Sequence, residues 1–524
     1  LYQITIGLGD KGLRAVDRVV AAVLQTIAML GKELNHEPEA AIARFAEQRQ
    51  LSELHFRYYT PGSSLSSASS ASANLQFYPP QDVIYGDYRT GSFNPALVQD
   101  LLARMVPENM LVVLASDELP AEFSPDRSSH WYDASYSINS APEAWFANWR
   151  HARNGASQAG IDAIAMPPPN RFIPQSFSLF ESPAAAASVP RLVRQEPGFE
   201  AWYMVDDEFE VPRVDISIAF ITSAISGQPR HQALANLYAL ALGEQLQQSI
   251  YPAYLAGMSA AFYPTLRGFT LKFGGYSDAM PALVEEVVGS LQNVSVDEQR
   301  FGELVAELER RWTRDMQVLP YQRLGSFASS RLYPQQADRP ALIEALRQVR
   351  YADLPQFARE FWPGSLQLVL AHGNIDDTLQ AQINESLDAL PRCACGREKI
   401  APPQTTILPV GTVVESVPIV HADHALLFYF QAPDKSIQSV AGSMLSAAIL
   451  EPRLFAQLRT RQQLGYIVNT AYMALYDWPG INLVLQSPGH SPLALSAAVE
   501  AYLAEFLPGA DADAFVQHRN ALVA

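Results

Sequence analysis

The chain has 524 residues, of which 48% are hydrophobic, and its formal net charge is −17. This length exceeds one ordinary hydrophobic core and predicts about three domains. The acidic balance argues against a nucleic-acid-binding surface, because such surfaces carry a basic patch or stripe. No apolar run reaches the roughly 18 residues that a membrane span needs. We therefore expect neither nucleic acid nor membrane as a partner.

The first residues indicate whether the sequence is complete, and the two cysteines indicate the cellular compartment. Leu1 opens a strand-like run with no basic and apolar leader before it, so we expect residues to be missing upstream. Cys393 and Cys395 are one residue apart, too close for an easy mutual bridge and too few for a four-thiolate zinc site. Without a disulfide framework, the cytoplasm is predicted, with the periplasm as the alternative.

Three stretches share one pattern: a short strand, a corner containing glycine, serine or aspartate, and an amphipathic helix. The predicted strands and helices are 2–6 with 13–30, 269–273 with 279–291, and 481–485 with 492–506, and further strands are predicted at 110–114 and 366–370. Similar units repeated along a chain indicate one module used several times. The predicted fold class is therefore α+β, with repeated modules that are each a mainly antiparallel sheet covered by helices on one side.

Composition places the domain boundaries. A stretch rich in proline and small residues predicts an extended linker over 161–198. The predicted domains are 1–160, 199–400 and 401–524, of which the first is incomplete at its start and the last is possibly incomplete at its end. Residues 63–73 are almost all serine and alanine, and they are compatible with either a small-residue helix or a loop.

The run from Gly7 to Gly12 has the local form of a dinucleotide-binding fingerprint, GxGxxG. A true fingerprint needs a second parallel strand after the helix, with an acidic residue near its end. Here the helix over 13–30 is followed by another helical segment, so no βαβ unit closes. We expect an ordinary turn into a helix and no nucleotide site.

Two histidine-containing segments resemble parts of zinc motifs by composition. His421 and His424 have HxxH spacing, but they precede a strand predicted over 425–431 and have no glutamate between them. The segment at His36 lacks a second histidine, and Pro38 would interrupt a helix there. Neither segment is predicted to bind zinc.

The most informative segment is the corner at 458–468. Apolar spacing predicts a helix over 436–463, which places Arg459 in its last turns, and Gly465 is expected to stop the helix. Tyr466 then begins an extended run. The structural alternative is an arginine that faces backbone carbonyls and a half-buried strand tyrosine. The related corner at 255–258 follows a helix, 233–251, that has no such arginine, which indicates a function for the second corner.

The segment from Leu458 to Val468 resembles the arginine and glutamine-leucine-glycine-tyrosine signature in the last domain of the insulinase/pitrilysin family of zinc peptidases. Further similarities cover nearly the whole chain. Segments 17–30, 85–88 and 107–110 resemble the second family domain, 172–177 the linker between the two halves, and 370–374 a strand end of the third domain.

The resemblance implies a zinc metalloendopeptidase whose two halves close over a peptide or small unfolded protein. In that family a zinc-bound water attacks the scissile carbonyl. The catalytic residues implied for this chain are Arg459 and Tyr466, which would contact the substrate backbone and the developing oxyanion. A guanidinium and a phenol both donate hydrogen bonds to charge that appears in a transition state.

The family's zinc ligands are a His-x-x-Glu-His motif and a distant glutamate in its first domain, and no such motif occurs in these residues. The resemblance therefore implies that this chain corresponds to the second to fourth domains and is inactive as given. Its expected partner is the zinc-bearing domain, on the same polypeptide or on a separate one. The cofactor is zinc in the family, without ligands in this chain.

Within the family, the alanine- and proline-rich texture is similar to that of the peptidases of pyrroloquinoline quinone biosynthesis, which process a small precursor peptide. A broad peptide-degrading protease of the pitrilysin type is the alternative. A catalytically inert chain that holds peptides for a separate zinc-bearing partner is the third possibility.

The missing motif leads to a direct prediction. The isolated 524-residue chain should hold no stoichiometric zinc and should cleave no peptide, because it lacks the ligands and the glutamate base. Metal analysis of the purified chain checks this. One tightly bound zinc ion per chain would contradict it.

Overall fold

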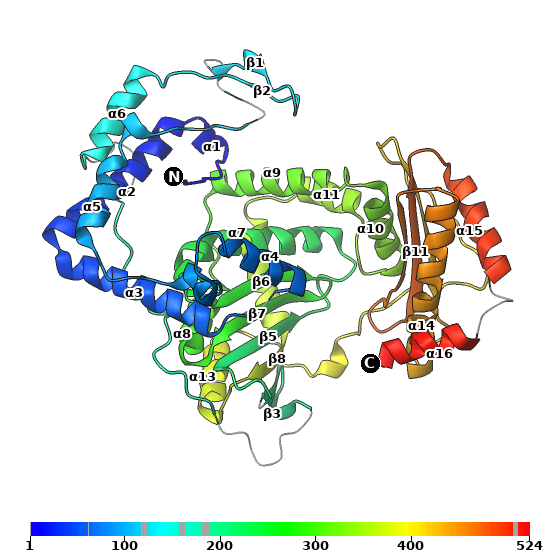
Figure 1. Cartoon of the computed structure of the whole chain (residues 1–524). Helices are drawn as coiled ribbons and strands as arrows, with labels where there is room; N and C mark the ends of the chain where they lie inside the picture. The colour runs from blue at the N-terminus through cyan, green and yellow to red at the C-terminus, as the bar shows by residue number, and fades with distance from the viewer. Residues whose placement is uncertain are drawn as a thin grey trace. The chain divides into compact units, whose positions relative to one another are not determined.

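The computed structural model describes residues 2–60, 62–116, 119, 123–156, 164–180, 189–206, 208–506 and 512–523 (Figure 1). The chain divides into two compact units, Leu1–Ile173 and Pro174–Ala524, and each is described by itself. Of the predicted linker 161–198, residues 161–163 and 181–188 lie outside the described part of the chain.

The first unit is mainly helical. Its elements are α1 (Asp10–Leu13), α2 (Val16–His36), α3 (Pro38–Arg57), α4 (Ser64–Asn74), η1 (Pro80–Asp82), η2 (Gly86–Tyr88), α5 (Pro95–Arg104), η3 (Pro107–Asn109), β1 (Arg127–Ser128), β2 (Ser135–Tyr136) and α6 (Glu143–Arg153). Helices α2 and α6 pack together around Leu24 and Trp149. The Trp149 indole also donates to the backbone carbonyl of Asp17 at 2.9 Å, so this core is joined by apolar contact and by a hydrogen bond.

The strands predicted at 2–6 and 110–114 are wrong. Neither segment has regular structure, and neither pairs with another described strand. Their apolar side chains are exposed, with Leu111 at 86% and Val113 at 79%. A strand needs a neighbour for its N–H and C=O groups, and an alternating sequence cannot supply one. The repeat pattern therefore does not extend to the described residues of this unit.

Two segments singled out in the sequence lie in the first unit. Residues 64–74 form helix α4, whose first turn is capped by the Ser63 hydroxyl, which accepts from the Ser66 N–H at 3.2 Å. The GxGxxG run enters α1 without a preceding strand, and no parallel strand pair occurs among the described residues of 2–36.

The second unit begins with a six-stranded module, 191–388. Its elements are β3 (Arg191–Glu196), β4 (Phe199–Val205), β5 (Arg213–Ile221), α7 (Pro229–Leu255), β6 (Ser259–Thr265), β7 (Gly268–Tyr276), η5 (Ser277–Ala279), α8 (Met280–Ser290), α9 (Glu298–Arg314), α10 (Pro320–Leu332), α11 (Arg339–Arg347), α12 (Asp353–Phe361), η6 (Trp362–Gly364), β8 (Leu366–Gly373) and α13 (Asp377–Asp388). The strand order is β3-β4-β8-β5-β7-β6, and only the β4–β8 pair is parallel.

One face of this sheet forms the core of the module. Ile216, Ile218 and Phe220 alternate along β5 and are almost fully buried, while Lys272 and His372 on the neighbouring strands are exposed. Helices α7 and α8 contact β6 and β7, and α7 also packs against α9, α11 and α12. The strands predicted at 269–273 and 366–370 and the helix at 279–291 are confirmed, as is the α+β class.

The start of the second unit is fixed to this module by side chains. The Asp278 carboxylate accepts from the backbone N–H groups of Gln175 and Ser176, at 2.8 and 3.2 Å. Asn374, which is 4% exposed, accepts from the Phe180 N–H at 2.7 Å and donates to the Ser178 carbonyl at 3.0 Å. Residues 175–180 are therefore held as an extended strap against the module.

A three-stranded module, 424–523, follows. Its elements are β9 (His424–Gln431), α14 (Ile437–Leu454), the π-helical turn η8 (Phe455–Arg461), β10 (Ile467–Tyr472), β11 (Gly480–Ser487), α15 (Pro492–Phe506) and α16 (Ala512–Val523). Strand β11 lies between β9 and β10, as β7 lies between β5 and β6. The order strand, helix, strand, strand, helix is thus the same in both modules, which confirms the predicted repeat for the second unit.

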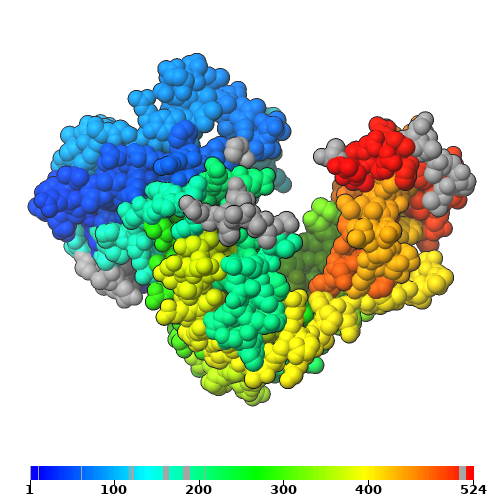
Figure 2. Space-filling view, turned by 90° about the horizontal axis from the view of Figure 1, so that it is seen from below, coloured from blue at the N-terminus to red at the C-terminus, as the bar shows by residue number. Residues whose placement is uncertain are grey.

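The two modules are joined by residues 389–423, which contain one short helix, η7 (Arg397–Lys399). From Ala401 to Val420 this segment has no helix or strand, and most of its residues are exposed. In Figure 2 the yellow part of the chain near residue 400 lies on the surface. Val410 and Val420 are fully exposed.

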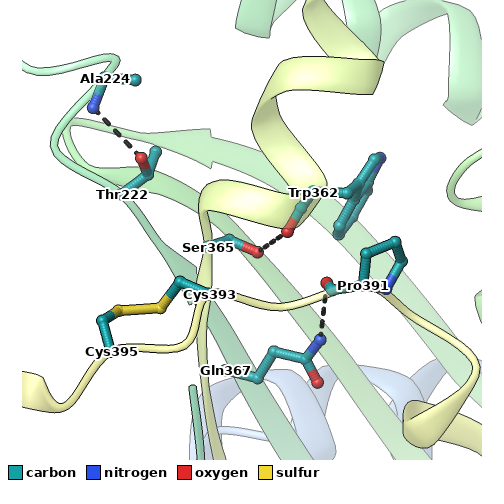
Figure 3. The surroundings of a disulfide bond; sticks show 8 residues. All are labelled: Thr222, Ala224, Trp362, Ser365, Gln367, Pro391, Cys393 and Cys395. Carbon is teal, nitrogen blue, oxygen red and sulfur yellow. Dashed lines mark hydrogen bonds between the residues drawn. A yellow bond between two sulfur atoms is a disulfide. The ribbon is translucent and has the colours of Figure 1, made fainter. Parts of the chain in front are cut away.

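The prediction that the two cysteines would not bridge is wrong, because Cys393 and Cys395 form a disulfide (Figure 3). Their Cα atoms are 5.2 Å apart, within the range that a disulfide spans. The loop is held on both sides: the Cys393 N–H donates to the Ser365 carbonyl at 2.9 Å, and the Cys395 carbonyl accepts from the Gly198 N–H at 2.6 Å. The predicted cytoplasmic location therefore loses the argument that supported it.

Among the described helices, none is both long and apolar enough to cross a membrane.

Candidate functional site

The corner singled out in the sequence joins η8 to β10. The predicted helix is confirmed as α14 followed by η8, and it ends at Arg461. The Gln462 N–H donates to the Gln457 carbonyl at 3.0 Å, five residues back, which is the spacing of a π-helix. Such turns are frequent at functional sites.

Gly465 does not stop the helix, contrary to the prediction. The left-handed backbone conformation lies at Gln463, with φ of 53°. Gly465 instead allows a close approach to the central strand, because a Cβ atom there would lie 2.1 Å from the Gln486 carbonyl oxygen. The wider π-helical turn moves the end of the helix, and the sequence pattern gives no sign of it.

The equivalent corner of the six-stranded module is shorter. Helix α7 ends at Leu255 and Gly257 has φ of 74°, so Gly257 corresponds to Gln463. Only Met258 then precedes β6, whereas Leu464, Gly465 and Tyr466 precede β10. Tyr466 therefore stands on an extension that the related corner lacks.

Arg459 lies on the exposed side of η8. The next residue toward the N-terminus, Leu458, is fully buried in the core of the module, and Arg459 points away from it into solvent. Its guanidinium carbon is 4.8 Å from the centroid of the Phe455 ring, a distance typical of cation–π contact. The Arg459 side chain is therefore exposed and lies against the Phe455 ring.

Tyr466 is 46% exposed, and its hydroxyl is fixed by two partners. It donates to Oδ2 of Asp423 at 2.7 Å and accepts from Nε2 of Gln486 at 2.5 Å. Gln486 Nε2 also donates to Asp423 Oδ2, at 2.8 Å. We call Asp423, Tyr466 and Gln486 the phenol triad. Its members come from the residue before β9, the residue before β10 and the end of β11, so the whole sheet positions it.

The triad is closed on its buried side. Gln486 is fully buried, and its Oε1 accepts from the backbone N–H of Tyr321, at the start of α10, at 3.2 Å. Asp423 is 9% exposed, and its own N–H donates to Nδ1 of His421 at 2.9 Å. The amide of Gln486 thus has partners for both of its polar atoms.

Hydrogen bonding shifts both titratable members of the triad. The bonds from Gln486 and Tyr466 lower the pKa of Asp423 below its ordinary 3.8, and the bond to Asp423 raises the pKa of Tyr466 above its ordinary 10.0. The contribution of Asp423 to the stability of the folded protein is complete above the pKa that Asp423 has in the unfolded chain. It is lost as the pH falls through the lower pKa that Asp423 has in the folded protein. The contribution of Tyr466 is complete below the pKa that Tyr466 has in the unfolded chain. It is lost as the pH rises through the higher pKa that Tyr466 has in the folded protein. From about pH 5 to pH 9 the pair therefore keeps a carboxylate and a neutral phenol.

Sequence reasoning missed Asp423 and Gln486. Asp423 lies inside the HxxH segment, in which the histidines carry the recognisable spacing, and Gln486 is an ordinary polar residue at a strand end. A polar residue in the central strand of a three-stranded sheet was the available signal, because a buried amide needs partners. His424 begins β9, and no group of three or more His, Cys, Asp or Glu residues suited to a metal ion occurs among the described residues.

Comparison with known proteins agrees with this fold. A family model described as the middle or third domain of peptidase M16 matches residues 56–345, more than half of the chain. A second, described as the C-terminal lobe domain 4 of PQQ synthase PqqF-like proteins, matches residues 444–524.

Individual relatives match almost the whole chain. Insulin-degrading enzyme of Homo sapiens is 25% identical over 533 residues, covering 99% of this chain and 51% of its own length. A nardilysin-like protein of Arabidopsis thaliana is 24% identical over 551 residues, and the match covers 100% of this chain and 51% of that protein. The crystal structure of pitrilysin matches with a TM-score of 0.71 at 20% identity, covering 99% of this chain and 54% of that one.

The chain therefore has a fold of the kind found in pitrilysin, and its second unit is built from repeated α+β modules. The chain belongs to the peptidase M16 family, the insulinase and pitrilysin family of zinc metallopeptidases. It spans about half the length of the curated relatives it matches.

The close approach at Gly465 gives a test of the corner. Gly465→Ala should lower the free energy of unfolding by about 2 kcal/mol or more, because the new methyl group overlaps a backbone carbonyl that cannot move aside. Urea unfolding checks this.

Gly442→Ala is the matched control, since a Cβ atom at this exposed site in α14 meets nothing within 4 Å. It should leave stability unchanged or raise it by about 0.5–1 kcal/mol. Equal stability of both variants would show that Gly465 imposes no close approach.

Proposed function

We propose that this chain is the substrate-enclosing portion of a zinc-dependent endopeptidase that cleaves peptides in a closed chamber. Its proposed substrate is the precursor peptide of pyrroloquinoline quinone. The observation that carries the proposal is the match of residues 444–524 to the C-terminal domain of PqqF-like proteins, because this stretch contains both Arg459 and Tyr466. The acidic balance of the chain also suits a neutral or basic peptide better than a polyanion.

Arg459 and Tyr466 are proposed to contact the peptide backbone and the oxyanion that develops on the scissile carbonyl. Both side chains are accessible and both carry N–H or O–H donors. Donors placed where negative charge develops stabilise that charge in the transition state. The two residues stand at one corner, on η8 and directly before β10.

The residues of this chain do not fit a zinc site by themselves, since its described part brings no suitable cluster of ligands together. Zinc belongs to the family, and its ligands are proposed to lie in a domain outside these residues. That zinc-bearing domain and the peptide are the proposed partners. The proposed location is the cytoplasm, with the periplasm as its alternative, and the Cys393–Cys395 disulfide favours the alternative.

Two other functions remain as alternatives. A broad peptide-degrading protease would use the same corner without selecting a precursor peptide. A catalytically inert chain would hold peptides for a separate zinc-bearing partner. The His-x-x-Glu-His motif, on the same polypeptide or on another, distinguishes the last possibility from the first two.

The substrate proposal is tested with the complete peptidase, including the zinc-bearing domain. We expect kcat/KM for the pyrroloquinoline quinone precursor peptide to exceed that for unrelated peptides of similar length and charge by about tenfold or more. Mass spectrometry locates the cleavage sites. Equal rates for all peptides would instead support the broad protease.

The site proposal is tested with Tyr466→Phe and Arg459→Lys in the same enzyme. Tyr466→Phe keeps the ring and leaves Gln486 bonded to Asp423, so the fold should persist. We expect kcat and kcat/KM to fall together by about 100-fold, because an oxyanion donor is lost. Arg459→Lys keeps the charge but loses the planar fork, and it should also be strongly impaired.

Each variant has a matched control. Tyr502→Phe removes a buried hydroxyl that has no hydrogen-bond partner among the described residues. Arg461→Lys changes a second exposed arginine of η8, which bonds only Gln457 among the hydrogen bonds described. Both controls should keep wild-type turnover. Wild-type turnover of Tyr466→Phe and Arg459→Lys would return these residues to a structural role.

A further inference from the structure

The phenol triad constrains how Tyr466 can act. A phenol has one proton to donate, and in this structure that proton lies in the bond to Asp423, 2.7 Å away. The hydroxyl oxygen also accepts from Gln486. With its proton committed, Tyr466 donates to a peptide only if the proton turns away from Asp423.

The position of the phenol oxygen is set from behind by buried groups. Gln486 is fully buried and is itself oriented by the Tyr321 N–H. An amide held in this way cannot turn without leaving a buried donor or acceptor unpaired, which is unfavourable. Its Nε2 therefore aims at Tyr466 and Asp423 together.

Exposure within the triad is graded. Gln486 is 0% exposed, Asp423 is 9% exposed and Tyr466 is 46% exposed. Tyr466 is the most exposed of the three, so a ligand would contact Tyr466, while Asp423 and Gln486 stay in place behind it.

We propose that Asp423 and Gln486 are positioning residues that fix the Tyr466 oxygen, and that Asp423 accepts the hydrogen bond from the Tyr466 hydroxyl until an acceptor on the bound peptide accepts that bond instead. No covalent bond forms or breaks in this step, because one hydrogen bond is exchanged for another. The inference rests on the proposed role of Tyr466, and it adds that this role depends on two residues that do not touch the substrate.

In the described part of the chain, two histidines and a tyrosine are the other titratable groups that act on the pair. His421 and His424 lie beside Asp423 and favour its ionised form when they are protonated, and Tyr321 lies beside Tyr466. The Oδ2 atom of Asp423 makes both bonds of the triad. An asparagine at residue 423 whose amide oxygen takes the place of Oδ2 would still accept from Tyr466 and Gln486, whereas an alanine would accept neither bond.

The test compares Asp423→Ala and Asp423→Asn in the complete peptidase, each with Tyr466 and with Tyr466→Phe. Asp423→Ala should lower kcat/KM by about tenfold or more, since the phenol loses its fixed position. Asp423→Asn should stay within about threefold of wild type, because the acceptor remains. In the Tyr466→Phe background, Asp423→Ala should have no further effect.

Thermal melts show whether each variant is folded, and Asp477→Ala is the control. Asp477 is an exposed carboxylate of the same module that bonds Lys435 at 2.7 Å, and its loss should leave kcat/KM unchanged. An equal loss from Asp423→Ala with and without the Tyr466 hydroxyl would overturn the inference. So would wild-type kcat/KM for Asp423→Ala when Tyr466→Phe is impaired, and this result would leave the proposed function standing.

A titration of the 524-residue chain alone provides a readout that does not depend on activity. The phenolate absorbance of wild type minus that of Tyr466→Phe isolates Tyr466 among the 22 tyrosines. It should titrate above 10.0 in wild type and at lower pH in the Asp423→Ala background. An unchanged titration would overturn the hydrogen bond on which the inference rests. Wild-type turnover of Tyr466→Phe would overturn the proposed role of Tyr466, and the inference with it.

Discussion

A side-chain amide that is buried in a sheet must find partners for its N–H and C=O groups, and Gln486 meets this requirement in three separate segments. It bonds the residue before β9, the residue before β10 and the first turn of α10. An unpaired buried amide is costly, by about 1–3 kcal/mol for each lost partner. The need to satisfy one residue therefore fixes where Tyr466 stands and joins the three-stranded module to the helix of its neighbour.

The corner that carries Tyr466 shows how a repeated module acquires a local feature. Both modules run strand, helix, strand, strand and helix, with the last of the three strands in the middle. The three-stranded module differs in its π-helical turn and in the three residues, in place of one, that precede its next strand. These changes bring a phenol to the surface, and Gly465 allows the longer corner to lie against β11. The rest of the module can remain an ordinary sheet with helices on its buried face.

The sequence predicted the elements whose pattern is local and strong. The helices at 279–291 and 492–506 and the strands at 269–273, 366–370 and 481–485 were predictable because apolar runs and apolar spacing are local signals. The strands at 2–6 and 110–114 were not, since a strand depends on a partner that its own sequence does not specify. The disulfide was missed because the backbone of its loop is set by Ser365 and Gly198, which are distant in sequence.

For the site, resemblance identified Arg459 and Tyr466, but no pattern indicated Asp423 or Gln486. Both residues bond the Tyr466 hydroxyl. Asp423 is 43 residues from Tyr466 in the chain, and Gln486 is 20 residues from it. Only three-dimensional placement brings such residues together. The end of the helix was also misplaced, because a π-helical turn has no sequence signature as clear as a glycine stop.

The strap at 175–180 has a practical meaning for dissecting the protein. It lies at the first residues of the second unit, directly after the division at Ile173 and Pro174, yet it is held by Asp278 and Asn374 of the six-stranded module. A recombinant fragment begun at the first strand, Arg191, would discard the strap and leave Asn374 without the Phe180 and Ser178 partners that satisfy it. A fragment begun at Pro174 keeps them. The natural cutting point for separating the units is therefore ahead of the strap, some way before regular structure begins.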